Sequence, residues 1–337
     1  MRNNLVKNIL NKHISKNNRF QLIDVGSQGG LEKEWKAIEN NIKIIGFEPD
    51  EREFKKLIQD KNHLYFNKVI WSKSETLNFH ITKGIEGSSV MIPNKELLKL
   101  FPNDERFEIV KTIPISSSQV QSLDTVILDR HLNDVDFLKL DTQGSELEIL
   151  KGSEIILNHY LLGLKIEVEF IELYKNQALF SEIDLYLKEK GFQLIDLKRH
   201  FWKRKSYSHF MGKGQLIFGD ALYFKNIDMF FHLLSNNKIA LSKEKIIKFV
   251  ILCLVYGMHD YAISILTYAF HRSLLEKASY GDILNLILKY DKKHRHLSFW
   301  GASKIIGLLQ RLSFKLRKDS SQWADADFFL GNRSNWI

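Results

Sequence analysis

The sequence is poor in cysteine, proline and glycine, and these shortages exclude several kinds of protein. A single cysteine, Cys253, excludes an internal disulfide and a zinc site built from several cysteines. Four prolines and 18 glycines in 337 residues argue against long disordered linkers. The longest apolar stretch, 249–270, is interrupted by His259 and Asp260, so neither half reaches the roughly 20 residues that cross a bilayer. The N-terminus lacks the apolar segment of a secretory signal, and we expect a cytoplasmic protein.

Positive charge is in excess, with a formal net charge of +9 and an isoelectric point near 9.3. Such a charge favours an anionic partner: nucleic acid, a membrane surface or an acidic substrate. A lysine-rich composition without a specific partner explains it equally well. Hydrophobic residues make up 44% of the chain, which suffices for a core, and the length suggests about two domains.

Strand-like and helix-like segments alternate between about residues 20 and 225. The strand candidates are FQLIDV, IKIIGF, LYFNKVIW, VDFLKL, GLKIEVEF, FQLIDL and GQLIFGDALYF. The helix candidates are LEKEWKAIEN, EREFKKLIQ, SELEILKGSEIILNHY and FSEIDLYLKEKG. This alternation predicts an α/β protein with a mostly parallel sheet and helices on both faces. TLNFHIT and FEIVKTIPI, around the loop GIEGSSVMIPN, predict an antiparallel insertion.

The pattern becomes helical after the last strand candidate. We therefore expect a sheet domain, 1–225, and a helical C-terminal domain of unknown role, 226–337. Within the second, KIIGLLQRLSFKLRK (304–318) would place five apolar side chains on one helix face and its cations mostly elsewhere. The apolar residues are Ile305, Leu308, Leu309, Leu312 and Leu316. Such a helix suits peripheral contact with a membrane surface, but docking on its own domain is the commoner arrangement.

A glycine turn follows the first strand candidate, in LIDVGSQGG. Asp24 precedes Gly26, Gly29 and Gly30, and glycine permits positive φ and close approach of the backbone to a ligand. The next strand candidate ends in GFEPD, which places Glu48 about 20 residues beyond the turn. An acid at that distance is typical of the ribose acceptor in a nucleoside-binding doubly wound sheet.

The composition of this turn favours one kind of nucleoside. It reads G-S-Q-G-G, without the G-x-G-x-x-G of a dinucleotide site. An acid before the turn would repel a pyrophosphate but attract a cationic ligand such as S-adenosylmethionine. A turn that only packs a helix against a strand is the structural alternative.

Several segments resemble the FkbM family of S-adenosylmethionine-dependent methyltransferases, over about residues 20–200. They are DVGSQGG, GFEPD, the SLDT segment before VDFLKLDTQGSELEILKG, and EVEF. The resemblance implies a class I methyltransferase fold, which is Rossmann-like and doubly wound, with seven strands of which the last is antiparallel. It also implies O-methylation of sugar hydroxyls on glycans, glycolipids or natural products. The helical C-terminal region matches nothing in the family. No cluster of residues with metal-ligand spacing appears in the sequence, so we expect no metal.

The resemblance also implies which residues hold the methyl donor, S-adenosyl-L-methionine. These are Asp24, Gly26, Ser27, Gln28, Gly30, Glu48, Pro49 and Asp141. Gln28 stands where the family more often has Asn, and because both are amides we expect its contact to persist.

Methyl transfer to a hydroxyl also needs a base that takes the proton. Ligands of such sheets bind outside the carboxyl ends of the strands, where we expect Asp141 and Glu169. A buried unpaired carboxylate is costly, so Glu167 and Glu169 should be paired or hydrated. We prefer Asp141 as the base, then Glu169, with Glu167 and His209 as further candidates. A salt bridge is the alternative for Glu167, and an ordinary loop position for His209.

A basic segment with interleaved aromatic residues, 198–214, is expected as a loop between the sixth and seventh strands. We predict that it binds the acceptor through Trp202, Arg204 and His209, with cations gripping acidic groups and aromatic rings stacking on sugar faces. Single-stranded nucleic acid would suit the same composition, and a loop without a ligand is the structural alternative.

The sequence therefore predicts an S-adenosylmethionine-dependent O-methyltransferase acting on a sugar hydroxyl of a glycan, glycolipid or related metabolite. The acceptor would be a carbohydrate-type molecule, either neutral or anionic. An RNA methyltransferase is the alternative enzyme, but Cys253 lies outside the sheet domain and no N-P-P-[YF] motif follows the fourth strand. A binding module that keeps the pocket without catalysis is a third reading. The acceptor sugar and the oligomeric state are not predicted.

Overall fold

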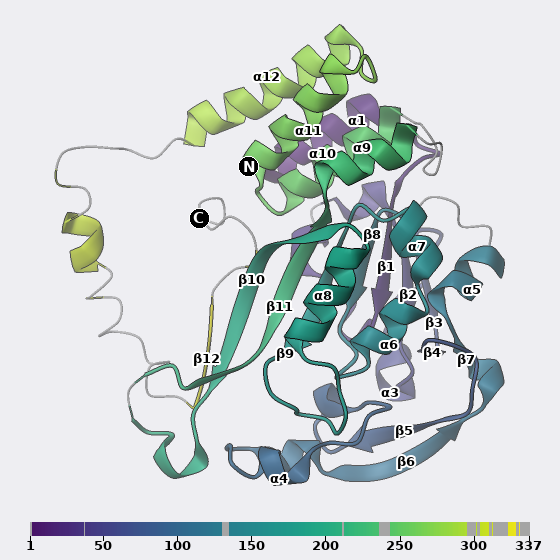
Figure 1. The fold of residues 1–337 in the computed structure, drawn as a ribbon, viewed down its shortest axis with the longest axis vertical. Helices are drawn as coiled ribbons and strands as arrows, with labels where there is room; N and C mark the ends of the chain where they lie inside the picture. The colour runs from purple at the N-terminus through teal and green to yellow at the C-terminus, as the bar shows by residue number, and fades with distance from the viewer. Residues whose placement is uncertain are drawn as a thin grey trace.

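An eight-stranded sheet forms the centre of the molecule (Figure 1). The structure is a computed structural model that describes residues 2–36, 38–129, 135–210, 212–235, 243–294, 301, 304–309, 312, 323–327 and 330. The strand order is β12-β10-β11-β9-β8-β1-β2-β3. The bounds are β1 (Phe20–Val25), β2 (Ile42–Phe47), β3 (His63–Phe66), β8 (Phe137–Leu140), β9 (Gly163–Glu169), β10 (Phe192–Trp202), β11 (Gln215–Lys225) and β12 (Ala324–Ala326).

Strand direction matches the fold that the resemblance implied. β3, β2, β1, β8 and β9 pair in parallel, whereas β11 runs antiparallel between β9 and β10. Without β12 these are seven strands, and the last of them in the chain is antiparallel. The class I methyltransferase fold is therefore confirmed.

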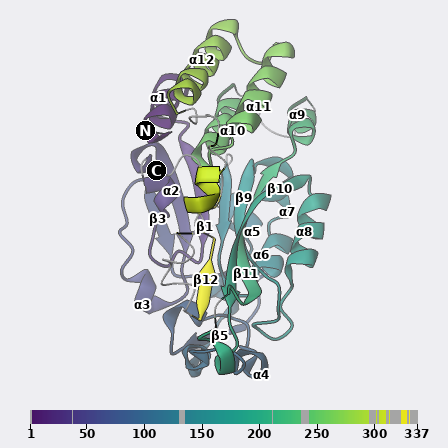
Figure 2. The same cartoon turned by 90° about the vertical axis from the view of Figure 1, so that its left-hand side faces the viewer.

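One face of the sheet is covered by four helices that follow the strands in the chain. They are α5 (Leu123–Asp129), α6 (Glu146–Lys151), α7 (Glu154–His159) and α8 (Phe180–Glu189). Figure 2 shows them on one side of the sheet, with α2 and α3 on the other. Their apolar side chains form one core cluster with alternate residues of β1, β2, β8, β9 and β11. Burial on both faces explains why the central strands are nearly continuous apolar runs.

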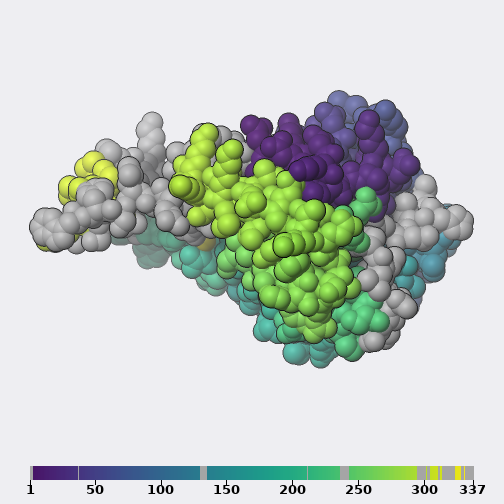
Figure 3. All heavy atoms as spheres, turned by 90° about the horizontal axis from the view of Figure 1, so that it is seen from above, coloured from purple at the N-terminus to yellow at the C-terminus, as the bar shows by residue number. Residues whose placement is uncertain are grey.

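The opposite face is covered near the amino ends of the strands by helices from both ends of the chain. They are α1 (Arg2–His13), α2 (Lys33–Lys36), α9 (Ile227–Ser235), α10 (Lys243–Val255), α11 (His259–His271) and α12 (Lys277–His294). Seen from above, α1 lies against the later helices (Figure 3), and Lys12 of α1 pairs with Asp282 of α12 at 2.6 Å. Cys253 is fully buried in α10.

The C-terminal helices share a core with the sheet. Phe20, Phe137 and Phe224 of the sheet belong to the same buried cluster as apolar residues of α9 to α12. The boundary at 225/226 stays a prediction, but the two regions pack through one continuous core.

The antiparallel insertion is confirmed. β5 (Leu77–Thr82) pairs antiparallel with β6 (Ile109–Ile115), and α4 (Lys95–Leu98) lies between them in the chain. β4 (Val69–Ile70) pairs with β7 (Val120–Gln121) beside it. The candidate LYFNKVIW is not one strand: it is divided into β3 and β4.

Four further segments differ from the sequence prediction. The helix candidates at 31–40 and 51–59 form only α2 and α3 (Glu51–Phe54). The first five residues of the basic segment 198–214 are not loop, because β10 continues to Trp202 and pairs with β11. The C-terminal region is not wholly helical, because β12 pairs antiparallel with β10 and adds an eighth strand.

The predicted amphipathic helix 304–318 is partly described. Residues 304–309 are helical, and Ile305, Leu308, Leu309 and Leu312 are exposed. Leu316 and the rest of that segment lie outside the described residues. None of the helices in the described part of the chain is long and apolar enough to span a membrane.

Candidate active site

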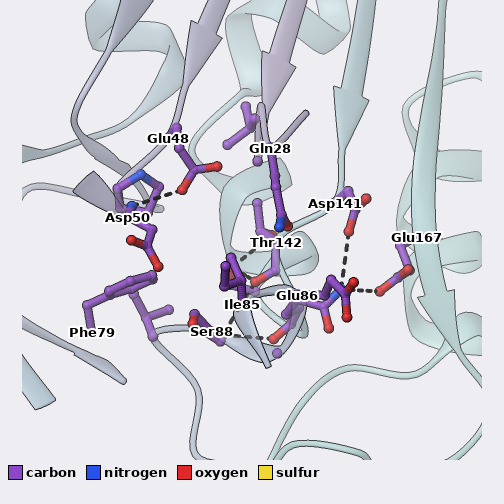
Figure 4. Close-up of a pocket in the computed structure, with 18 of the residues that line it drawn as sticks. Gln28, Glu48, Asp50, Phe79, Ile85, Glu86, Ser88, Asp141, Thr142 and Glu167 are labelled. Atoms are coloured by element: carbon purple, nitrogen blue, oxygen red, sulfur yellow. Dashed lines mark hydrogen bonds between the residues drawn. The ribbon is translucent and has the colours of Figure 1, made fainter. Parts of the chain in front are cut away.

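A cavity of about 490 Å³ lies at the carboxyl ends of the central strands. One part is lined by residues that follow β1, β2 and β8, and another by the insertion and by the ends of β10 and β11. Figure 4 shows Gln28, Glu48, Asp141 and Glu167 around it. Predicted donor contacts from the glycine turn and catalytic candidates from β8 and β9 thus line one cavity.

The glycine turn after β1 lies directly against the end of β8. Gly26 has a φ of +81°, and a Cβ built there would lie 1.9 Å from the carbonyl oxygen of Asp141. No other residue fits this position. Ser27 is buried, where its hydroxyl donates to the Asp24 carbonyl at 2.8 Å and accepts from the Phe47 amide at 3.1 Å. The turn therefore ties β1 to both neighbouring strands.

Asp24 is buried behind this turn and does not line the cavity. Its carboxylate lies 3.1 Å from Nζ of Lys139, which donates to the Gly26 carbonyl at 2.6 Å. Burial raises the pKa of Asp24 to about 6, although Lys139 pulls it down. Burial would lower the pKa of Lys139, but Asp24, Asp141 and Glu32 together hold it above its usual range. Asp24 thus holds Lys139 in place, and Lys139 in turn holds the backbone of the turn that lines the cavity.

Five of the eight predicted donor contacts line the cavity: Gly26, Gln28, Glu48, Pro49 and Asp141. The Glu48 carboxylate is 6% exposed and accepts the Asp50 amide at 2.8 Å through Oε1. Its second oxygen accepts no hydrogen bond from a described residue. Burial raises the pKa of Glu48 to about 7. Ser27 and Gly30 belong to the turn but not to the cavity wall.

A row of charged side chains crosses the sheet near the carboxyl ends of its strands, on the face that α10 covers. Asp24 is in register with Lys139, and Lys139 with Lys165. Lys165 pairs with Glu32 at 2.6 Å and with Asp220 at 3.2 Å. Because side chains alternate along a strand, β9 places Leu164, Ile166 and Val168 in the core under α5 to α8, and Lys165, Glu167 and Glu169 on the opposite, charged face. This alternation explains the charged residues of the otherwise apolar β9.

Asp141 and Glu167 are held side by side by one amide. Nε2 of Gln143 donates to Asp141 at 3.2 Å and to Glu167 at 2.8 Å. Its carbonyl oxygen accepts from the hydroxyl of the buried Tyr174 at 3.0 Å, which fixes the orientation of the amide. Figure 4 shows these two contacts as dashed lines that end at Asp141 and at Glu167. Burial, followed by the charge of Asp141, raises the pKa of Glu167 well above its usual value.

Glu169 does not line the cavity and is fully buried. Neither of its carboxylate oxygens accepts a hydrogen bond from the part of the chain that is described. Burial, then the charges of Glu146 and Asp141, raises its pKa well above the usual value. Glu146 closes the loop before α6 by accepting the amides of Thr142 and Gly144, at 2.7 and 2.9 Å.

The far end of the cavity has aromatic walls. Trp202, Phe107 and Phe218 line it together with Arg106. Arg204 and His209 do not: Arg204 donates to Gln215 and His209 is exposed. Of the three predicted acceptor contacts, the structure brings only Trp202 to the cavity.

Sequence reasoning missed four residues of this site. Lys139 was available as a charged residue inside the apolar candidate VDFLKL, and Gln143 as part of the LKLDTQGSELEILKG block. Tyr174 and Arg106 carry no signal in the sequence, because they reach the site from separate loops.

Comparison with known proteins gives one family. The model of the methyltransferase FkbM domain matches residues 24–194, slightly more than half of the chain. No curated protein sequence matches the chain. A solved structure from Listeria monocytogenes, named as a candidate S-adenosylmethionine dependent methyltransferase, aligns at 10% identity over 66% of this chain and 99% of its own. Its TM-score is 0.33, too low to bear on this chain.

Proposed function

Because the chain belongs to the FkbM methyltransferase family, it is an S-adenosylmethionine-dependent methyltransferase, and we propose that its acceptor is a sugar hydroxyl of a glycan, glycolipid or related metabolite. One observation carries this proposal. A single cavity joins a bridged pair of carboxylates, Asp141 and Glu167, to a wall of aromatic rings. The carboxylates suit proton removal from a hydroxyl, and the rings suit the apolar face of a sugar.

The residues around the glycine turn fit the methyl donor. Glu48 keeps one carboxylate oxygen without a partner among the described residues, so it can accept hydrogen bonds from ribose hydroxyls. The missing side chain of Gly26 allows its backbone to lie against Asp141, and Gln28 and Pro49 complete this wall. When bound, S-adenosylmethionine supplies a methyl group on a positively charged sulfur, which becomes a neutral thioether on transfer.

The carboxylate pair can remove the proton of the acceptor. Transfer to oxygen forms a carbon–oxygen bond while the hydroxyl proton passes to a base. Asp141 is the better placed acceptor of that proton, because 42% of its side chain is exposed at the cavity. Gln143 donates to both carboxylates and so holds them in one geometry. Glu167 is the second candidate to accept the hydroxyl proton, since its raised pKa favours its protonated form beside Asp141.

The charge of the cavity weighs against RNA. Six acidic residues and two basic ones line it: Glu48, Asp50, Glu53, Glu86, Asp141 and Glu167 against Lys68 and Arg106. A polyanionic acceptor would be repelled by most of this surface.

The proposal is tested by incubating the purified protein and S-adenosylmethionine with tagged oligosaccharides and, in parallel, with RNA. We expect a sugar product heavier by one CH₂ unit, detected by mass spectrometry. The variant Asp141→Asn should lose at least about 100-fold in turnover, the scale of general base catalysis, while its affinity for the donor stays near that of the wild type. Methylated RNA without any methylated sugar would overturn the proposal.

The pH dependence of turnover gives a second test. A carboxylate base works only when ionised, so any share of Glu167 in proton removal should make the rate rise with pH through the raised pKa of Glu167. Glutamine cannot ionise, so in Glu167→Gln that rise should disappear. An unchanged profile would remove Glu167 from the proton-accepting pair.

A further inference from the structure

Arg106 lies in the wall of the cavity, at the end that carries the aromatic rings. It belongs to a short 3₁₀ helix, Asp104–Phe107, within the insertion. Its guanidinium carbon is 4.8 Å from the ring centres of Phe107 and Trp202, and 5.3 Å from that of Trp323. Three rings from three separate segments thus hold the guanidinium in place.

The side chain has no polar partner among the described residues. Its Nε is buried without a hydrogen bond, and no carboxylate of the described chain lies within ion-pair distance. Glu86 is the acid whose charge acts on it most, but that residue is exposed and not paired with it. Burial lowers the pKa of Arg106, yet a guanidinium remains charged in proteins.

Arg106 is half-buried, and taking a cation out of water without a partner is costly, so residues of this kind usually have one. The planar guanidinium presents parallel N–H groups that match a carboxylate or a phosphate in a bidentate arrangement. Stacking on aromatic rings leaves the edge of that plane free for such a contact. The partner that this chain does not supply is therefore expected on the ligand.

We propose that Arg106 binds an acidic group, a carboxylate or a phosphate, on the acceptor. The inference rests on the proposed carbohydrate acceptor and specifies its class: an acidic sugar such as a uronic acid or a sugar phosphate. Trp202 and Phe218 line the same end of the cavity and offer faces for the sugar ring.

The distribution of charge in the cavity sets the orientation of such an acceptor. Glu48 and Asp50 occupy the donor side, and Asp141 and Glu167 the carboxylate pair, so an acidic group is repelled there. Arg106 is the cation at the aromatic end. An acidic sugar therefore enters with its negative group at Arg106 and a hydroxyl toward Asp141, which would exclude the reverse orientation.

The test is calorimetric binding of glucuronate, glucose 6-phosphate and glucose to the full chain saturated with S-adenosylhomocysteine. The variants are Arg106→Gln, which removes the charge, and Arg106→Lys, which keeps it without the planar fork. Arg272 is the matched control, since it also stacks on a ring, that of Tyr268 at 4.5 Å, but it caps the C-terminus of α11 and does not line the cavity. Unchanged binding of S-adenosylhomocysteine to each variant shows that the fold is retained.

We expect an acidic sugar to bind more tightly than glucose, and Arg106→Gln to weaken that binding by about 10- to 100-fold, as for hydrogen bonds to a charged group. Arg106→Lys should fall between, and Arg272→Gln should match the wild type. Whether glucuronate or glucose 6-phosphate is preferred distinguishes a carboxylate from a phosphate. Equal binding of glucose and the acidic sugars, or acidic-sugar binding unchanged in Arg106→Gln, overturns the assignment but leaves the carbohydrate proposal intact. Absence of binding by every sugar overturns both.

Discussion

Nζ of Lys139 lies 3.1 Å from Oδ1 of Asp24, and this buried pair joins the ends of β8 and β1 behind the cavity. Lys139 also donates to the carbonyl of Gly26, so the pair supports the turn that we propose holds the methyl donor. Both side chains are less than 10% exposed. The carboxylate before the glycine turn is thus a support of the turn, neutralised by a lysine.

Asp24→Asn should destabilise the protein by about 3 to 5 kcal/mol, because it leaves the buried Lys139 without its nearest charge partner. Chemical denaturation of Asp24→Asn, Lys139→Met and the double variant measures this. We expect a coupling energy above about 1 kcal/mol, as for residues in contact. Strictly additive losses would mean that the pair does not support the turn.

Glu169→Gln should stabilise the protein at neutral and alkaline pH. The pKa of Glu169 is raised in the folded state, mainly by burial, so the folded protein binds a proton that the unfolded chain releases above its ordinary pKa. The wild type therefore loses stability as pH rises from the ordinary to the raised pKa, by at most about 1.4 kcal/mol per pH unit. Glutamine resembles the protonated form and does not titrate.

The measurement is the free energy of unfolding of both proteins between pH 4.5 and pH 8. The difference in favour of Glu169→Gln should grow with pH. Glu189→Gln, an exposed position on α8, is the control and should leave the slope unchanged. A difference that is constant across this range would contradict the raised pKa.

Asp136 links the C-terminal helices to the sheet. It is fully buried before β8, with Lys245 at 2.7 Å and Lys248 at 3.0 Å, both from α10. Asp136→Asn leaves two buried cations facing a neutral amide and should cost about 3 to 5 kcal/mol. Because the helices share the core of the sheet, the loss should appear in one unfolding transition measured by urea denaturation.

Lys243→Met is the control for this link. Lys243 belongs to the same helix and pairs with Glu276 at 3.3 Å, but it is 38% exposed, so the change should stay within about 0.5 kcal/mol. Two separate unfolding transitions would show that the helices fold independently of the sheet.

The sequence predicted those parts of the fold and site that depend on short-range patterns. The apolar runs of β1 and β2, and the glycine turn with Glu48 at the expected distance, were sufficient for the sheet and the donor side of the cavity. The strand β12 was not predictable, because three residues at a sheet edge carry no periodicity. Residues 198–202 were predicted as loop because of their charged side chains, but they continue β10, which pairs with β11 in a long hairpin.

The acceptor side depends on contacts between distant segments. Arg106 reaches the cavity from the insertion, and the aromatic rings that pack around its guanidinium belong to Phe107, Trp202 and Trp323. Tyr174 orients Gln143 from a loop after β9. Neither arrangement follows from spacing, since each depends on how the insertion and the hairpin fold over the rim.

The most direct test of the account is calorimetry of S-adenosylmethionine and of NAD with the wild type and with Glu48→Gln. We expect S-adenosylmethionine to bind and NAD not to bind. Loss of the Glu48 carboxylate should weaken the donor by about 10-fold or more, since a hydrogen bond to a charged group contributes about 1.5 to 3 kcal/mol. Tight binding of NAD without binding of S-adenosylmethionine would contradict the assignment of this cavity.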